Sequence, residues 1–324
     1  MKYYLAPMDN ITDYIYRQIV WRHFPYWDKM YAPFIQPNEK PTIVPKENRD
    51  ICPENNMGLP VVPQILTCDP EGFIRVGEIL EGYGYQEINL NLGCPAKAIV
   101  SKGKGSAMLA DTHKLNQFLQ RVFNHEWKAK ITVKTRLGLT DNSDFNEVLD
   151  IFSGYPIQEL IIHPRFRTDY YGGLPRLDEY EKVFNLLHRC NKPKFLICYN
   201  GNIFSKNDVL SISSQYPLTD NIMCGRGAIS NPGLIRELKR GLPMTVNEFK
   251  AFHDDVYRSY QCINLSERHF LHKMMEMWTY WSNNLSYNVD VFKRLRVAST
   301  ISEYNSCLNE LYNDISINNK KGCT

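Results

Sequence analysis

The sequence predicts an α/β fold, a (β/α)8 TIM barrel followed by a small C-terminal all-α helical domain. Short runs of apolar, β-branched and aromatic residues alternate eight times with helix-like segments. Polar residues follow the ends of these runs, whereas a doubly wound sheet would gather them near one switch point. Eight units in about 240 residues also match the usual size of such a barrel.

The expected strands are short, and helix-like segments lie between most of them. The segment 69–84 begins with Asp69 and Pro70, residue types that favour a helix N-terminus. The segment 111–127 repeats apolar residues at helical spacing. The expected strands span residues 2–8, 30–36, 61–66, 87–94, 130–136, 159–165, 195–201 and 221–227.

The pattern changes after Gly241, where three helix-like segments follow one another without an intervening strand. These segments span residues 245–264, 266–285 and 289–317. We therefore expect a catalytic barrel over 1–240 and a helical domain over 241–324. The second part carries as many acidic as basic residues, so it is not a basic arm of the kind that binds nucleic acid by charge alone.

Composition narrows the class of protein. The 324 residues carry a net charge of +3, and their nine cysteines include no C-x-x-C pair, which argues against a zinc site or a redox pair. The chain begins without the apolar core of a signal peptide, and no run reaches the length of a membrane span. We expect a monomer in the reducing cytoplasm, with no metal and no membrane partner.

The last two expected strands end in motifs suited to an anion. Asn200-Gly201-Asn202 follows the seventh strand and Gly225-Arg226 follows the eighth. In barrels, the loops after strands seven and eight commonly bind phosphate through backbone amides. Taken alone, either motif could also be an ordinary turn at the end of a strand.

Further polar residues end other strands. Lys134, near Arg136, faces the barrel mouth, where a cation could stabilise developing negative charge or form a structural ion pair. His163 precedes Arg165, and this pair suits an anion or a polar ring, although hydrogen bonding alone would also explain the histidine. Gln64 has an amide that could pair with the carbonyl and N–H edge of a ring.

Cys94 ends the fourth strand, directly before a proline and a lysine-rich loop. The loop segment 101–106 lacks the spacing of a nucleotide-binding P-loop, and no G-x-G-x-x-G follows a strand. No cysteine or histidine lies at a spacing that would complete a metal site, and no activating base marks a strong nucleophile. A small core residue and an acid remain as readings of this cysteine.

Seven motifs between Ala6 and Ala228 resemble, in order, those of bacterial tRNA-dihydrouridine synthases. The pair formed by GCPAK and GSAML is the most discriminating. The segment 268–281 is similar, less specifically, to the helical RNA-binding domain of that family. The motifs span residues 6–17, 64–65, 88–97 with 102–109, 133–138, 161–167, 200–203 and 225–228.

The resemblance implies flavin mononucleotide (FMN) bound across the barrel mouth. It implies that NADPH reduces the flavin and that the reduced flavin saturates the C5–C6 bond of a uracil in tRNA. The implied cofactor residues are Pro7, Met8 and Asp9 along the flavin, Gln64 and Lys134 at its ring with Asn91 and His163 nearby, and Asn200, Gly201, Asn202, Gly225 and Arg226 at its phosphate end.

The resemblance also implies that Cys94 donates a proton to C5. An ordinary thiol has a pKa near 8.5 and is mostly protonated at about pH 7, which suits this role. The uridine must be flipped out of the folded RNA to reach the site. Lys97, Lys102, Lys104 and Arg165 would then contact tRNA, although a solvated loop would explain any single one of the three lysines.

Two positions depart from the family pattern. Asn202 stands where the family more often has aspartate, and Pro164 stands where it more often has glycine between the histidine and the arginine. Two other functions remain open. One is an FMN-dependent barrel oxidoreductase that acts on a free pyrimidine or enone, and the other is a non-catalytic RNA-binding protein that retains the barrel.

Overall fold

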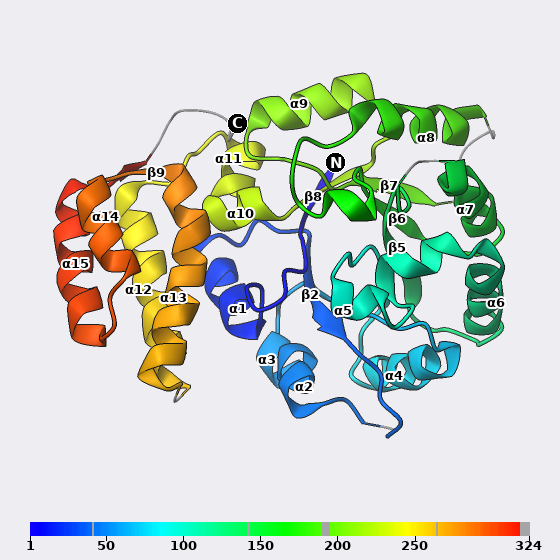
Figure 1. Cartoon of the computed structure of the whole chain (residues 1–324), viewed down its shortest axis with the longest axis horizontal. Coiled ribbons are helices and arrows are strands. Elements are labelled where there is room, and N and C mark those ends of the chain that lie inside the picture. The colour runs from blue at the N-terminus through cyan, green and yellow to red at the C-terminus, as the bar shows by residue number, and fades with distance from the viewer. Residues whose placement is uncertain (41, 141–142, 190–194, 264, 318–324) are drawn as a thin grey trace.

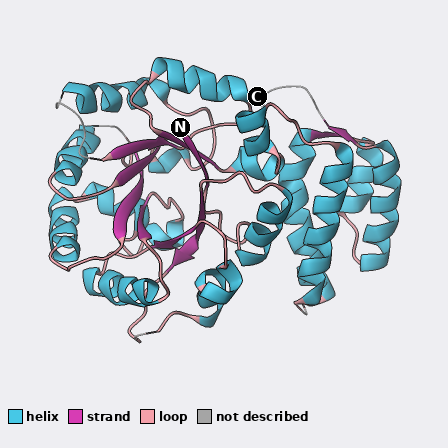
Figure 2. Ribbon diagram, turned by 180° about the vertical axis from the view of Figure 1, so that it is seen from behind, coloured by secondary structure: helices cyan, strands magenta, loops and turns pink. Residues whose placement is uncertain are grey.

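The structure, a computed structural model, describes residues 1–40, 42–140, 143–189, 195–263 and 265–317. Eight parallel strands form a closed barrel in sequence order, surrounded by helices (Figures 1 and 2). The predicted barrel and its eight strands are confirmed. The strands are β1 (Lys2–Leu5), β2 (Lys29–Ile35), β3 (Val61–Ile65), β4 (Glu87–Leu92), β5 (Lys130–Arg136), β6 (Glu159–His163), β7 (Leu196–Tyr199) and β8 (Asn221–Cys224).

The strand register decides which side chains meet inside the barrel. Asn91 of β4 lies opposite Lys134 of β5, and Arg136 of β5 lies opposite His163 of β6. Leu5 of β1 pairs with Cys224 of β8 and closes the barrel. Because all strands are parallel, their C-terminal residues converge at one mouth.

Helices cover the outside of the barrel, and side-chain caps start several of them. Asp69 accepts the N–H groups of Glu71 and Gly72 at the start of α4, and Asp111 accepts that of Lys114 at the start of α6. Both predicted helices, 69–84 and 111–127, are confirmed. The covering elements are α1 (Tyr14–His23), α2 (Pro45–Ile51), α3 (Pro53–Asn56), α4 (Pro70–Gly82), α5 (Lys97–Val100), η1 (Gly105–Ala110), α6 (Thr112–Phe123), α7 (Ser143–Ser153), η2 (Arg167–Asp169), α8 (Leu177–Arg189), α9 (Lys206–Gln215), α10 (Arg226–Ser230) and α11 (Leu234–Arg240).

The C-terminal helices stand together beside the barrel (Figure 1). The helix-like segment predicted over 289–317 contains two helices, because Thr300 starts a new helix by accepting the N–H of Glu303. The prediction of no strand in this part is wrong, because two short strands pair antiparallel there. The elements are α12 (Val246–Cys262), α13 (Glu267–Trp281), η3 (Ser282–Asn284), β9 (Leu285–Ser286), α14 (Val289–Arg296), α15 (Ile301–Asp314) and β10 (Ser316–Ile317).

The hydrophobic core runs from the barrel into these helices without a break. The ring of Phe252 in α12 meets that of Tyr16 in α1 edge to face, with the ring centroids 6.0 Å apart. Gly241 ends α11 in the left-handed region, with φ of 71°. The domain boundary between residues 240 and 241 stays a prediction. Across the described part of the chain, no helix is both long and apolar enough to cross a membrane.

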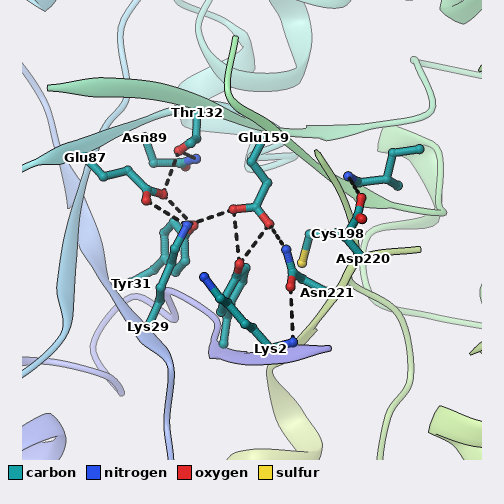
Figure 3. Close-up of polar contacts among 12 residues, drawn as sticks. Lys2, Lys29, Tyr31, Glu87, Asn89, Thr132, Glu159, Cys198, Asp220 and Asn221 are labelled. Carbon is teal, nitrogen blue, oxygen red and sulfur yellow. Dashed lines mark hydrogen bonds and ion pairs between the residues drawn. The ribbon is translucent and has the colours of Figure 1, made fainter. Parts of the chain in front are cut away.

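A polar cluster fills the N-terminal end of the barrel interior (Figure 3). Lys29 Nζ lies 2.7 Å from Glu87 Oε2 and 2.8 Å from Glu159 Oε2. Tyr31 donates to Glu87, and Asn221 donates to Glu159. Lys29, Glu87, Glu159 and Asn221 begin the four even-numbered strands, so they form one layer of the barrel. Burial of these charges is tolerated because each carboxylate has a cation and neutral donors as partners.

Candidate active site

A cavity of about 690 Å³ opens at the C-terminal end of the barrel. Its volume lies within the range of about 300–1,000 Å³ that is usual for cofactor and small-ligand sites. All twelve residues predicted to hold a cofactor line this cavity, together with Cys94 and Arg165. The twelve are Pro7, Met8, Asp9, Gln64, Asn91, Lys134, His163, Asn200, Gly201, Asn202, Gly225 and Arg226.

Two arginines converge on Asn202 at one side of the cavity. Arg226 Nη2 donates to Asn202 Oδ1 at 2.8 Å, and Arg165 Nη2 donates to the same oxygen at 3.1 Å. Arg165 also donates to the carbonyls of Gly172 and Gly173 in the loop after β6. Asn202 is neutral, and among the described residues neither guanidinium group forms an ion pair with a carboxylate.

Lys134 and Arg136 bring two more positive charges from β5. Burial, together with the neighbouring Arg136, lowers the pKa of Lys134 to about 8. Arg136 donates to the carbonyls of Gly93 and Phe166, and its guanidinium carbon lies 5.3 Å from the centroid of the Tyr171 ring. Among the described residues, neither cation forms an ion pair with a carboxylate. The cavity is therefore suited to an anionic or electron-rich ligand.

His163 is neutral in this setting. Burial, and then the nearby positive charges led by Arg136, lower the pKa of His163 well below its usual value. Arg165 Nη1 lies 2.9 Å from His163 Nε2, and a guanidinium can only donate, so Nε2 accepts this hydrogen bond. The ring proton therefore belongs on Nδ1, which makes that nitrogen a hydrogen-bond donor.

Cys94 lies in a tightly held turn after β4. Asn91 Oδ1 accepts the backbone N–H groups of Gly93 at 3.0 Å and Cys94 at 2.9 Å. On the other side, Ser106 Oγ donates to the carbonyl of Cys94 at 2.9 Å. Gly105, with φ of +61°, passes so close that a Cβ there would lie 2.8 Å from the same carbonyl oxygen. The turn is thus clamped between β4 and η1.

The Cys94 side chain is a thiol at neutral pH. Burial raises its pKa above the ordinary value, and this effect exceeds the opposing influence of the Ala96 N–H, Arg136 and Lys134. A thiol with a raised pKa is a poor nucleophile and a competent proton donor. Of the two readings that the sequence left for Cys94, this environment favours the acid, since the residue is only partly buried and lines the cavity.

The loops after β7 and β8 pack closely against each other. Asn200 Nδ2 donates to the carbonyl of Met223, which joins the two strand ends. A Cβ at Gly227 would lie 1.9 Å from the carbonyl oxygen of Ile203, so only glycine fits at the start of α10. This contact holds the 200–202 segment beside Gly225 and Arg226 at the cavity.

The three predicted loop lysines lie outside the cavity lining. Lys97 is the first residue of α5, and Lys102 and Lys104 follow in the turn before η1. Lys97 and Lys102 are exposed and Lys104 is partly buried. The structure therefore separates them from Arg165, which was predicted to share their role and which lines the cavity.

Several residues that line the cavity were not predicted from the sequence. Tyr170 and Tyr171 come from the loop after β6, and Glu276 and Tyr280 come from α13. The sequence predicts no role for Arg136, which also lines the cavity. Tyr170 has a φ of 48°, which is rare for a residue with a side chain and depends on the folded loop. Glu276 and Tyr280 reach the cavity because α13 packs against the barrel. No local sequence pattern predicts this packing.

Comparisons with known proteins identify the family. A family model described as "Dihydrouridine synthase (Dus)" matches residues 4–314. The chain is 30% identical to tRNA-dihydrouridine synthase B of Pasteurella multocida (strain Pm70), over 73% of this chain and 68% of that protein. It is 31% identical to tRNA-dihydrouridine(16) synthase of Shewanella oneidensis, over 74% of this chain and 76% of that protein. Probable tRNA-dihydrouridine synthase 2 of Bacillus subtilis is 26% identical, over 79% and 78%.

A solved structure shares the barrel. A morphinone reductase mutant in complex with tetrahydroNAD superposes with a TM-score of 0.51 and 10% identity, over 74% of this chain and 86% of that one. At this identity the likeness concerns the fold alone. The motifs of the cavity and the match of the family model over nearly the whole chain lead to one conclusion: the protein belongs to the dihydrouridine synthase family.

Proposed function

We propose that this protein is an FMN- and NADPH-dependent tRNA-dihydrouridine synthase, which reduces the C5–C6 bond of a uridine in tRNA. The observation that carries the proposal is the position of Cys94, a protonated thiol in a cavity that is also lined by Lys134, Arg136, Arg165 and Arg226. The names of the relatives, tRNA-dihydrouridine synthases from several bacteria, supply the substrate class.

The residues of the cavity fit FMN. Arg226 and Arg165 have no carboxylate partner among the described residues, and they lie beside the close-packed glycine loops that suit a phosphate. Asn200 to Asn202, Gly225 and Arg226 would hold the phosphate end. When bound and reduced by NADPH, FMN would supply the hydride for C6 of the uracil.

The proposed ring contacts use the remaining polar groups. Lys134 is cationic below about pH 8 and would stabilise negative charge on a reduced ring system. His163 would offer its Nδ1–H, and Gln64 and Asn91 would offer their amides. Pro7, Met8 and Asp9 lie in the loop after β1 and would cover one side of the ring.

Cys94 would complete the reduction of the uracil. Hydride addition at C6 leaves a carbanion-like centre at C5, and the Cys94 thiol would transfer its proton there. The thiolate that remains would take a proton from solvent before the next turnover. The clamps from Asn91 and Ser106 fix where this proton is delivered.

The substrate must reach the cavity as an unpaired, flipped base. Lys97 and Lys102 are exposed on the loop beyond Cys94, where they would meet RNA phosphates, with Lys104 next to them. Arg165 lies deeper and would contact the flipped base or the phosphate of the same nucleotide. We propose that the helices of 241–324 form the domain that holds the rest of the tRNA, and that the protein acts as a cytoplasmic monomer.

The direct test uses the purified protein with FMN, NADPH and tRNA that lacks modifications. Nucleoside mass spectrometry is expected to show dihydrouridine after incubation with tRNA and none after incubation with free uridine or uracil. Absence of product with every tRNA, together with turnover of a free pyrimidine or an enone, would instead identify an oxidoreductase of metabolites. Failure to bind FMN would favour a non-catalytic RNA-binding protein.

The Cys94→Ala variant tests the acid. It is expected to bind FMN and to be reduced by NADPH as the parent is, and to form dihydrouridine slower by roughly 100-fold or more, the usual worth of a positioned acid. Cys68→Ala is the matched control, because Cys68 is an exposed thiol outside the cavity lining. Equal rates for Cys94→Ala and the parent would refute the role of Cys94.

A further inference from the structure

A ladder of buried polar side chains connects the floor of the barrel to the turn that carries Cys94. We infer that Glu87, Asn89 and Thr132, which do not line the cavity, are positioning residues that orient Asn91 and thereby hold Cys94 in place. Figure 3 shows the lower part of this ladder, where Glu87, Thr132 and Asn89 lie next to one another above Lys29. The inference rests on the proposed role of Cys94 as the acid.

The ladder climbs through strands β3, β4 and β5. Thr132 Oγ1 donates to Glu87 Oε1 at 3.2 Å, and Asn89 Nδ2 donates to Thr132 Oγ1 at 2.9 Å. Gln64 Nε2 then donates to Asn89 Oδ1 at 2.7 Å, and Asn91 Nδ2 donates to Gln64 Oε1 at 2.7 Å. The last step is from the N–H groups of Gly93 and Cys94 to Asn91 Oδ1.

The groups at the two ends of the ladder allow each amide side chain between them only one orientation. At the bottom, Glu87 is a carboxylate that faces Lys29 at 2.7 Å and the hydroxyl of Tyr31 at 3.0 Å, so it only accepts. At the top, the backbone N–H groups only donate. Between these ends, the amides of Asn89, Gln64 and Asn91 must all point the same way for every hydrogen bond to form.

Burial strengthens the preference of the amides for this one orientation. Gln64 and Asn89 are fully buried, Thr132 is 1% exposed and Asn91 is 7% exposed. A rotated amide would place two donors or two acceptors face to face within this buried ladder, which costs the free energy of two hydrogen bonds. Removing the lower rung leaves the amides above it fixed from the top alone, so the rotated orientation costs fewer hydrogen bonds than in the parent, although no atom near the cavity has changed.

The consequence for the site concerns what Asn91 offers on each side. Its oxygen is occupied by two backbone N–H groups, so only one amide N–H remains for a ligand in the cavity. In the rotated form, Asn91 would turn its NH₂ group toward the N–H of Cys94 and repel it. The turn would then open, and the thiol would lose the placement that proton transfer to carbon requires.

Thr132→Val tests the inference, because valine has the shape of threonine and neither donates nor accepts. Thr132→Ser keeps the hydroxyl and is the rescue variant. Thr135→Val is the matched control, since Thr135 is a buried threonine of the same strand whose hydroxyl, among the described residues, bonds only to the carbonyl of Arg136. Asn89→Leu removes the adjoining rung and provides a second route if Thr132→Val does not fold.

The first measurement is the rate at which iodoacetamide alkylates Cys94, followed by peptide mass spectrometry with Cys68 as the internal reference. Thr132→Val and Asn89→Leu are expected to react roughly threefold faster or more at Cys94, because the turn opens more often. Thr132→Ser and Thr135→Val are expected to match the parent. This measurement needs neither tRNA nor turnover, so it decides the inference even if the proposed function fails.

The second measurement is steady-state reduction of tRNA. With FMN at saturation, because Gln64 and Asn91 are also proposed ring contacts, Thr132→Val is expected to lower kcat by about tenfold or more, as loss of an outer partner commonly does, with the KM for tRNA nearly unchanged. The double variant Thr132→Val/Asn89→Leu is expected to lose no more than either single variant, because both break one ladder. Parent-like alkylation of Cys94 in Thr132→Val and Asn89→Leu, or equal acceleration in Thr135→Val, would overturn the inference.

Discussion

Lys134 shows how burial sets the charge of a single residue in the site. Its pKa of about 8 lies close to physiological pH because burial and Arg136 both disfavour the charged form. The side chain is therefore charged below about pH 8 and neutral above it. An anion that binds at Lys134 favours the charged form, so its affinity must fall as the pH rises through this value.

We predict that the parent protein binds reduced FMN, whose ring is anionic, more weakly as the pH rises from 7 to 9, by up to about tenfold per pH unit above the pKa. Lys134→Met is expected to bind reduced FMN more weakly at pH 7 and to lose this part of the pH dependence. Anaerobic titration with dithionite-reduced FMN measures both. Lys130→Met removes a lysine at the exposed start of β5 and should behave as the parent. A parent affinity that does not change with pH would contradict the prediction.

Much of the candidate site could be predicted at the residue scale. Gln64, Asn91, Lys134 and His163 lie at the C-terminal ends of parallel strands, which must converge. Chain order alone is then enough to bring them together. The rungs below the cavity were not predicted, because Asn89 and Thr132 look like ordinary polar residues of a strand, and only the register shows that they touch.

His253 is the polar centre of the C-terminal helices. It lies on α12, fully buried, with Nε2 2.9 Å from the hydroxyl of Tyr304 on α15 and Nδ1 2.6 Å from that of Tyr312. Burial lowers the pKa of His253 below 6.5, more than the adjacent Asp254 raises it. The folded protein therefore binds this proton less readily than the unfolded chain does, and stability is lost as the pH falls below about 6.5.

We predict that the free energy of unfolding of the parent, measured in urea, falls more between pH 7.5 and pH 5 than that of His253→Gln. Glutamine can keep a hydrogen bond to a tyrosine and has no proton to gain. His269→Gln, which alters an exposed histidine on α13, serves as the control and should follow the parent. Identical pH dependence in all three proteins would show that His253 does not contribute to acid sensitivity.

The elements differ in how far the sequence specifies them. Each barrel strand could be predicted because it is a compact run of apolar and β-branched residues, such as 159–163. The pair β9 and β10 could not, because Leu285 pairs with Ile317 only after the helices between them have packed. The helix start at Thr300 had a local signal, a threonine three residues before Glu303, but the prediction treated 289–317 as one helix-like segment.

At the scale of the whole molecule, the C-terminal helices help to build the cavity. Lys273 of α13 bonds to the carbonyl of Asn10 and lies 3.2 Å from Asp13 Oδ2, and Tyr260 of α12 donates to Asp13 Oδ1 at 2.6 Å. Asp13 in turn caps α1. The loop from Pro7 to Asp13 is therefore held by residues that lie more than 240 positions later in the chain.

We predict that Lys273→Met loosens this loop, because it removes two hydrogen bonds made by a charged group, a loss of roughly 1.5–3 kcal/mol each in typical cases. Hydrogen exchange of the amides of residues 9–13 is expected to accelerate, and dihydrouridine formation to slow. Lys293→Met is the control, since Lys293 is an exposed lysine on α14. Unchanged exchange in Lys273→Met would mean that Tyr260 alone holds the loop.

The ion cluster of Lys29, Glu87 and Glu159 gives the barrel a closed floor, so the cavity has its opening at the other end. Under the proposed function, the nicotinamide that brings electrons and the uridine that takes them share that opening and must visit it in turn. The reaction is thereby divided into two half-cycles. Between these two half-cycles, the protein would have to keep one electron pair on its bound cofactor while the opening of the cavity is exposed to water and oxygen.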